Sequence, residues 1–110
     1  MAVAPDATVR RALGLISAHN ISQLPVLRGD ECVGSLSESA LMSRVIEDPA
    51  VLERSAGDVM EAPFPVVEAQ VQMAALGRLL TRQNPAVLVR RDGAITGIVT
   101  RYDMVRYLSQ

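Results

Sequence analysis

The chain repeats its own residue pattern at a separation of 63 positions, and this repetition limits its possible folds more than any other feature. Without gaps, the separation places Val3 on Val66 and Ala12 on Ala75. The other matches at this separation are Leu13-Gly14 on Leu76-Gly77, Val26 on Val89, Arg28 on Arg91, and Gly34 on Gly97. They fall at equivalent points of a helix–strand–strand–helix order, which indicates an internal duplication.

The first half carries signals for a helix, a hairpin and a second helix. Asp6 or Thr8 is placed to cap the first helix and Ser37 the second, because short polar side chains accept hydrogen bonds from N–H groups at helix starts. Asp48 ends the second helix, since the residue before Pro49 is pushed out of the helical region. The predicted elements are a helix at residues 8–20, strands at 21–27 and 32–36, and a helix at 38–48.

The second half repeats this order after a connecting segment. Short helical turns are predicted at residues 50–54 and 57–60, then an extended segment at 63–67, a helix at 71–83, strands at 86–89 and 95–99, and a helix at 102–108. We place the first repeat at residues 1–48, with a shortened N-terminal segment, the connector at 49–57 and the second repeat at 58–110. Each sheet has one apolar face, so the prediction is an α/β fold in which two halves bury a common core. Four methionines are expected in apolar cores: Met42, Met60, Met73 and Met104.

Composition removes several classes of function. The net charge is −1 with no block of like charge, which gives no support for binding nucleic acid or an anionic membrane. All eleven cationic residues are arginines, so no lysine is available for a Schiff base. Cys32 is the only cysteine and His19 the only histidine, so no metal site and no internal disulfide is predicted. No apolar run approaches the ~18 residues of a membrane span, and a cytoplasmic location is expected.

Two stretches in each repeat resemble a known family. The first repeat contains ISQLPV at residues 21–26 and VGSLSE at 33–38, and the second contains NPAVLV at 84–89 and GIVTRYD at 97–103. These stretches resemble the body of a CBS domain, so the chain is similar to a tandem, pseudo-twofold pair of CBS repeats, each a small β-sheet with two flanking helices. The stretches ISQLPVLRGDECVGSLSES, EAPFPVV and NPAVLV look most like the C-terminal regulatory region of bacterial cystathionine β-synthases. CBS pairs attached to transcription regulators have similar sequences.

The resemblance implies a regulatory module that binds an adenosine compound and catalyses nothing itself. Candidate ligands are AMP, ADP, ATP and S-adenosylmethionine; no cofactor is expected, and pairs are expected to form homodimers. A carboxylate at a helix start accepts hydrogen bonds from both ribose hydroxyls, and the helix dipole favours a nearby phosphate. The implied ligand-binding residues are Ile98, Thr100, Arg101 and Asp103 from the second repeat, with Ile21, Ser22 and Gln23 from the first as the adenine wall.

A second cleft is implied by the duplication, and it lacks the ribose carboxylate. It takes Leu36, Ser37 and Ala40 from the first repeat, with Asn84, Pro85 and Ala86 from the second. Because Ala40 stands where the other repeat has Asp103, we expect this cleft to be empty or weak. Without the resemblance, Asp103 is an ordinary helix-start residue. The alternatives are therefore a structural dimerisation or autoinhibitory pair with vestigial clefts, or the sensor domain of a transcription regulator. The parent implied by the narrower match is a pyridoxal-phosphate-dependent synthase.

Overall fold

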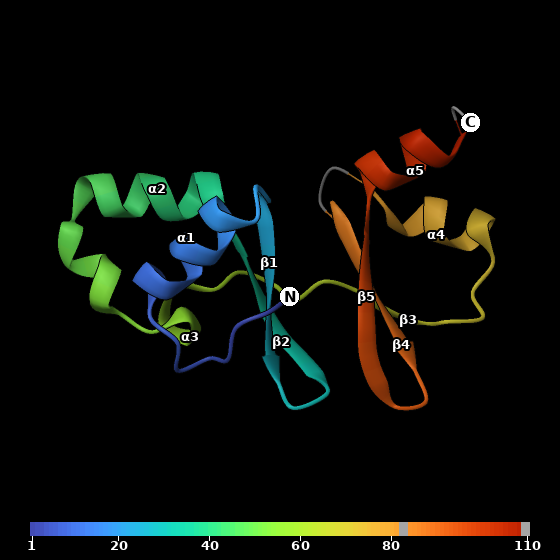
Figure 1. The fold of residues 1–110 in the computed structure, drawn as a ribbon, viewed down its shortest axis with the longest axis horizontal. Coiled ribbons are helices and arrows are strands. Elements are labelled where there is room, and N and C mark those ends of the chain that lie inside the picture. The colour runs from blue at the N-terminus through green and yellow to red at the C-terminus, as the bar shows by residue number, and fades with distance from the viewer. Residues whose placement is uncertain (82–83, 109–110) are drawn as a thin grey trace. The chain divides into compact units, whose positions relative to one another are not determined.

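The computed structural model describes residues 1–81 and 84–108, and the side chains of all of these except residues 73 and 106–108. The chain divides into two compact units, Met1–Pro63 and Phe64–Gln110. Each unit contains a small sheet and helices (Figure 1), which confirms the predicted α/β class. The repeat boundaries at residues 48 and 58 stay predictions from the sequence.

The first unit is built on a two-stranded antiparallel sheet. Its elements are α1 (Val9–Ala18), β1 (Gln23–Arg28), β2 (Glu31–Ser37), α2 (Glu38–Glu47), the 3-10 helix η1 (Pro49–Glu53) and α3 (Ala56–Val59). Thr8 caps α1 by accepting a hydrogen bond from the Arg11 N–H at 3.1 Å, and Asp48 ends α2 before Pro49. Gly29 turns the hairpin at a φ of +61°, a conformation that glycine adopts without steric cost.

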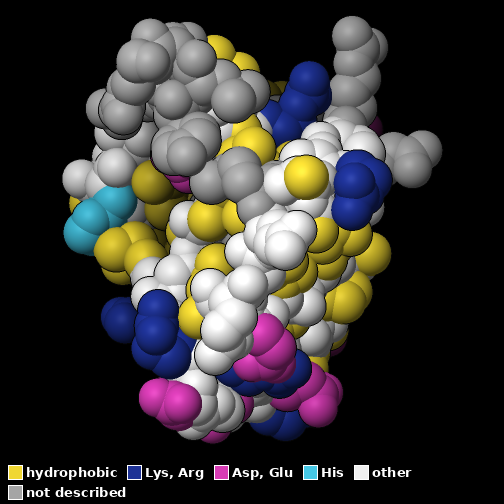
Figure 2. All heavy atoms as spheres, turned by 90° about the vertical axis from the view of Figure 1, so that its right-hand side faces the viewer, with side chains coloured by type: hydrophobic (Ala, Val, Ile, Leu, Met, Phe, Trp, Pro, Cys, Tyr) yellow, Lys and Arg dark blue, Asp and Glu magenta, His cyan; other side chains and the backbone are white. Residues whose placement is uncertain are grey.

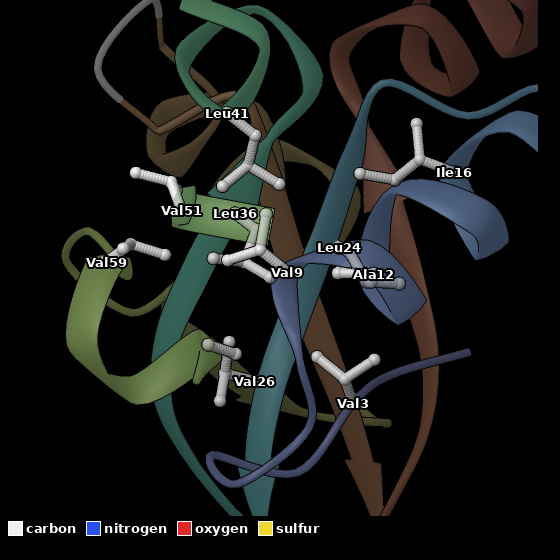
Figure 3. Packing of buried hydrophobic residues seen from close by; sticks show 11 residues of the cluster. Val3, Val9, Ala12, Ile16, Leu24, Val26, Leu36, Leu41, Val51 and Val59 are labelled. Carbon is white, nitrogen blue, oxygen red and sulfur yellow. The ribbon is translucent and has the colours of Figure 1, made fainter. Parts of the chain in front are cut away.

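One hydrophobic core holds the first unit together. It draws Val9, Ala12 and Ile16 from α1 and Leu24, Val26 and Leu36 from the hairpin (Figure 3). The short helices also contribute to it, through Val51, Ala56 and Val59. The segment between residues 49 and 59 is therefore packed into the first unit and is more than a connection.

The second unit has a three-stranded sheet in the order β3-β4-β5. Its elements are β3 (Val66–Glu68), α4 (Met73–Leu79), β4 (Ala86–Arg91), β5 (Ala94–Thr100) and α5 (Arg101–Leu108). Its core contains Leu76, Leu80 and Val87, with Val99 and Met104 packed against them, so both helices cover one face of the sheet (Figure 1). Charged side chains gather at the lower end of the view in Figure 2, where Figure 1 places the β4–β5 turn with its exposed Arg91 and Asp92.

The two hairpins confirm the duplication in their register. Val26 pairs with Gly34 and Val89 with Gly97, and each hairpin has an irregularity directly after that valine. The other cross-strand pairs also correspond at a separation of 63. The pair Gln23↔Ser37 corresponds to Ala86↔Thr100, and the pair Arg28↔Glu31 corresponds to Arg91↔Ala94. The predicted repeat is therefore correct for the hairpin and the helix that follows it.

In the segment before each hairpin, equivalent residues are 64 positions apart. The ungapped separation of 63 is therefore wrong for this part of the repeat. Val3 lies beside Val26 in a parallel bridge, whereas Val67, not Val66, lies beside Val89. Ala12 and Ile16 are buried in α1. Leu76 and Leu80, which lie 64 positions later, are buried in the second unit. Inward-facing positions define equivalence in a packed core, so Ala12 corresponds to Leu76 and not to Ala75. Counted from these equivalent core positions to the hairpin, the second repeat is one residue shorter than the first.

Two further predictions differ from the structure. Helix α4 begins at Met73 and is capped at Leu80, so it is shorter than the predicted helix at 71–83; residues 82 and 83 lie outside the described part. Met42 is 42% exposed and Ile46 76% exposed, so Met42 is not a core residue. Leu41 and Val45 face the core from α2. Successive residues of an α-helix are rotated by about 100°, so Met42 and Ile46, which follow them, face away from the core. None of the helices in the described residues is long and apolar enough to cross a membrane.

Candidate functional site

Thr100 and Asp103 form a reciprocal pair at the start of α5. The Thr100 N–H and hydroxyl both donate to Asp103 Oδ2, at 2.9 and 3.0 Å. In return, the Asp103 N–H donates to Thr100 Oγ1 at 3.2 Å. Helix starts leave N–H groups without partners inside the helix, and a pair of this kind satisfies two of them. The sequence pattern thus brings a hydroxyl and a carboxylate together at a helix N-terminus.

The side chains around this pair are open to solvent. Arg101 and Asp103 are exposed, Thr100 is half-buried, and Ile98 is 37% exposed. The Oδ2 atom of Asp103 accepts both bonds from Thr100, and neither bond uses Oδ1. An exposed carboxylate oxygen beside a helix N-terminus is suited to accept hydrogen bonds from hydroxyl groups, and the dipole adds attraction for an anion.

The corresponding helix start in the first unit is capped in one direction. Ser37 Oγ accepts a hydrogen bond from the Ala40 N–H at 3.3 Å. Ala40 has no side-chain oxygen to return a bond to Ser37, so the reciprocal pair of the second unit is missing here. The predicted difference between the two helix starts is thus a difference in local hydrogen bonding as well as in charge.

Each unit also ties the segment before its first hairpin strand to the helix start. The Glu38 N–H donates to the Ser22 carbonyl at 3.0 Å, and the Arg101 N–H donates to the Pro85 carbonyl at 3.2 Å. Within the first unit, Ser22 and Gln23 therefore lie beside Ser37. Within the second unit, Pro85 and Ala86 lie beside Thr100, since Ala86 pairs with Thr100 across the hairpin. Sequence reasoning missed these carbonyl anchors, and no side-chain pattern marks them.

Two residues of the predicted second site are buried in their own unit. Leu36 is 2% exposed within the core of the first unit, and Ala86 is fully buried. Register explains the first case: Leu36 corresponds to Val99, which packs on the core of its own unit. The counterpart of Ile98 in this register is Ser35, and the assignment of Leu36 to the second site stays a prediction. The remaining residues of the second set, Ser37, Ala40, Asn84 and Pro85, are half-buried.

The adenine-wall residues of the first repeat differ in exposure. Ile21 and Gln23 are half-buried and Ser22 is exposed. Asn20 precedes them at a φ of +52°, and the Ile21 N–H donates to the Ile16 carbonyl at 3.1 Å, so this turn is fixed to the end of α1. Among the described residues there is no group of three or more His, Cys, Asp or Glu that could hold a metal ion.

Comparison with known proteins places the chain among CBS domains. The family profile for the CBS domain matches residues 1–47 and 56–110. The CBS-domain-containing protein ATU1752 from Agrobacterium tumefaciens is 23% identical, with a TM-score of 0.81 over 98% of this chain and 88% of that chain. A CBS-domain-containing protein of unknown function from Bacillus anthracis is 22% identical, with a TM-score of 0.83 over 99% and 83%. CBSX2, solved in complex with AMP, is 26% identical, with a TM-score of 0.78 over 100% and 87%.

Proposed function

Because the chain belongs to the CBS domain family, we propose that it is a regulatory module whose ligand is an adenosine compound bound at Thr100 and Asp103. The observation that carries the proposal is the exposed carboxylate at the start of α5, held in place by its bonds to Thr100. The AMP complex of CBSX2 supports the choice of ligand class. Sensing of AMP, ADP, ATP or S-adenosylmethionine is the function that these residues support best, with no catalytic step in the module.

The chemistry of ribose fits a fixed carboxylate. Ribose presents two neighbouring hydroxyl donors, and a carboxylate offers two oxygens with several acceptor positions. Asp103 Oδ2 is already oriented by Thr100, so binding does not require the side chain to give up several rotamers. Charge-assisted hydrogen bonds contribute roughly 1.5–3 kcal/mol each. In this proposal, two such bonds favour a ligand that carries a ribose over one that does not.

The neighbouring residues supply the remaining contacts in this proposal. Arg101 is exposed at the first position of α5, where its guanidinium can pair with a phosphate. Ile98 offers an aliphatic surface two residues before Thr100. The adenine wall of Ile21, Ser22 and Gln23 and its use by the same ligand stay predictions from the family resemblance. The same is true of the weak second site at Ser37 and Ala40 with Asn84 and Pro85.

A structural role is the alternative, and the cap geometry favours it. The bonds between Thr100 and Asp103 stabilise α5 without any ligand, so Asp103 has a sufficient reason to be present. In this alternative the module dimerises or inhibits an attached domain, and its clefts are vestigial. The parent protein, a cystathionine β-synthase or a transcription regulator, is predicted by sequence resemblance alone.

Calorimetric titration of Asp103→Asn separates ligand binding from capping. The amide oxygen of asparagine still accepts the Thr100 N–H, but the charge is lost and one acceptor becomes a donor. We expect wild type to bind at least one of AMP, ADP, ATP and S-adenosylmethionine, and Asp103→Asn to bind it about tenfold or more weakly, since 1.4 kcal/mol corresponds to tenfold. Affinity is measured by calorimetry, and melting of the ligand-free proteins reports the cap.

The matched control is Asp92→Asn, which removes the same charge from the β4–β5 turn. Asp92 has a φ of +52°, which asparagine adopts equally well, so the fold and the ligand affinity should be unchanged. If no adenosine compound binds wild type at millimolar concentration, the structural alternative replaces the proposal. Equal affinities of wild type and Asp103→Asn would remove Asp103 from the site.

A further inference from the structure

Residues 60–62 cover the outer edge of β2 in the first unit. The Ser35 N–H donates to the Glu61 carbonyl at 3.1 Å, and the Glu61 N–H donates to the Ser35 carbonyl at 2.8 Å, which makes an antiparallel bridge. The Ser35 hydroxyl donates to the Ala62 carbonyl at 2.6 Å. These bonds to Ser35 hold the segment against the sheet.

The Met60 side chain fills the space above Gly34. A Cβ atom at Gly34 would be 2.7 Å from Met60 Cγ, and the atom nearest to it would be Met60 Sδ. The absence of a side chain at Gly34 therefore allows the thioether to lie directly on the strand. Gly34 is buried, whereas Met60 is half-buried at the border of the first core. The sulfur is thus in tight contact with the sheet, and small molecules in solvent can still reach the side chain.

The surroundings of this sulfur are unsuited to an added oxygen. Met60 packs against an apolar cluster. The donors close to Gly34 in the strand are engaged, because the Cys32 thiol donates to the Gly34 carbonyl at 3.3 Å and both donors of Ser35 are used by the covering segment. A sulfoxide oxygen is polar, and a buried acceptor without a donor is costly. An oxidised Met60 would therefore leave Gly34 and turn its oxygen to water.

We propose that Met60 is a reversible oxidation site that controls whether residues 60–62 stay on the edge of β2. Hydrogen peroxide transfers one oxygen atom to the thioether, which loses two electrons and becomes a sulfoxide, while the O–O bond breaks and water leaves. The sulfoxide moves off Gly34, and the bonds of the segment to Ser35 are lost with it. In the reverse step, two thiols reduce the sulfoxide and give a disulfide and water. The released segment leads directly to Phe64, the first residue of the second unit.

Other methionines with described side chains are placed differently. Met1 is 56% exposed and Met42 42% exposed, so an oxygen on either sulfur can be hydrated without a change in the fold. Met104 packs against the core of the second unit, so its oxidation should affect amides of that unit and not Ser35. The position of each added oxygen must therefore be measured together with its effect.

The test uses the full chain, labelled with ¹⁵N and treated with millimolar hydrogen peroxide, and peptide mass spectrometry measures oxidation at Met60. Amide hydrogen exchange by NMR reports the Ser35 and Glu61 N–H groups, which bond across the bridge. We expect both amides to exchange about tenfold or more faster when Met60 is a sulfoxide. The Ala12 N–H, bonded to the Thr8 carbonyl in α1 at 3.1 Å, should not change. A thiol-dependent methionine sulfoxide reductase should restore slow exchange.

Three variants make the test specific. Met60→Leu keeps the apolar volume and cannot form a sulfoxide, so Ser35 should stay protected in peroxide. Met42→Leu is the matched control, since it removes an exposed methionine and should leave the response of Ser35 intact. Met60→Gln places a polar group on an unbranched side chain and should open the edge without peroxide.

Three results would count against this role of Met60. Unchanged Ser35 exchange after complete oxidation of Met60 would overturn the proposal. Faster Ser35 exchange in peroxide-treated Met60→Leu would also overturn it, since Cys32 or another group would then be the oxidised site. An equal acceleration at Ala12 would show a loss of global stability in place of the release of one segment, and the proposal would fail.

Discussion

Gly34→Ala and Gly97→Ala introduce the same methyl group at equivalent positions of the two repeats, and we expect opposite effects on stability. At Gly34, the new Cβ would be 2.7 Å from Met60 Cγ and 2.9 Å from Met60 Cβ, closer than real Cβ contacts allow. At Gly97, nothing lies within 4 Å. Neither glycine has a positive φ, so backbone strain does not distinguish the two sites.

The change in the free energy of unfolding depends on how Met60 responds to the added methyl group. Overpacking of this kind costs about 1–3 kcal/mol. If Met60 moves away instead, the bonds of Ser35 to Glu61 and Ala62 weaken with it, and each contributes about 1 kcal/mol net. A gain of about 0.4–1 kcal/mol from the stiffer unfolded chain acts at both sites. Gly34→Ala should therefore destabilise by up to about 2.5 kcal/mol, and Gly97→Ala should be neutral or stabilise by up to about 1 kcal/mol, so the two variants should differ by about 1–3 kcal/mol.

Urea unfolding followed by circular dichroism measures both variants against wild type. The double variant Gly34→Ala/Met60→Ala is the third measurement, because shortening Met60 removes the atoms that the new methyl group meets first. The double-mutant cycle should show favourable coupling of more than about 0.5 kcal/mol between the two changes. Equal stabilities of Gly34→Ala and Gly97→Ala would refute the reasoning from Met60. Additive effects in the cycle would place the cost of Gly34→Ala elsewhere.

Two further substitutions test other local features. Ala40→Asp supplies the missing carboxylate beside Ser37, so a reciprocal cap should form at α2 and stability should rise by about 0.5–1 kcal/mol in urea unfolding; an unchanged midpoint would contradict this. Arg10→Ala removes the bonds from the arginine Nε and Nη2 to Glu53 Oε1, at 2.8 and 2.5 Å, but both side chains are more than 60% exposed. The loss should be below about 1 kcal/mol and should shrink further in 1 M salt, and a larger, salt-independent loss would show that Arg10 acts through packing.

The hairpins and caps were predictable from the sequence because their signals are local. Turn residues such as Gly29 and Gly93, and caps such as Thr8 and Ser37, act within four residues of their own position. The asymmetry between Asp103 and Ala40 was visible for the same reason. These local signals are enough to place both hairpin turns and the start of both final helices.

Features that depend on contacts between distant residues were not predictable in this way. Met60 lies on Gly34 and Glu61 pairs with Ser35, and nothing near either residue in the sequence marks these contacts. The separation of 64 in the first helix of each repeat can be recognised only from the residues that face the core. Ala12 and Ala75 are identical residues at a separation of 63, but Ala12 is buried and Ala75 is half-buried. Apolar periodicity alone predicts a wide apolar stripe on α2 that includes Met42, and only packing shows that Leu41 and Val45 fill the side facing the core.

The one-residue difference between the repeats bears on the second predicted site. It lies between the last equivalent core positions, Ile16 and Leu80, and the hairpins, in the segment that leads to Ser22 in the first repeat and to Pro85 in the second. Ser22 retains an N–H that can read an adenine edge, and Pro85 has none. The two predicted sites therefore differ at the adenine wall as well as at the carboxylate. On the proposed function, Ala40→Asp should strengthen the α2 cap without adding a second ligand, so calorimetric titration should give the same stoichiometry as wild type; a doubled stoichiometry would show that the carboxylate alone decides occupancy.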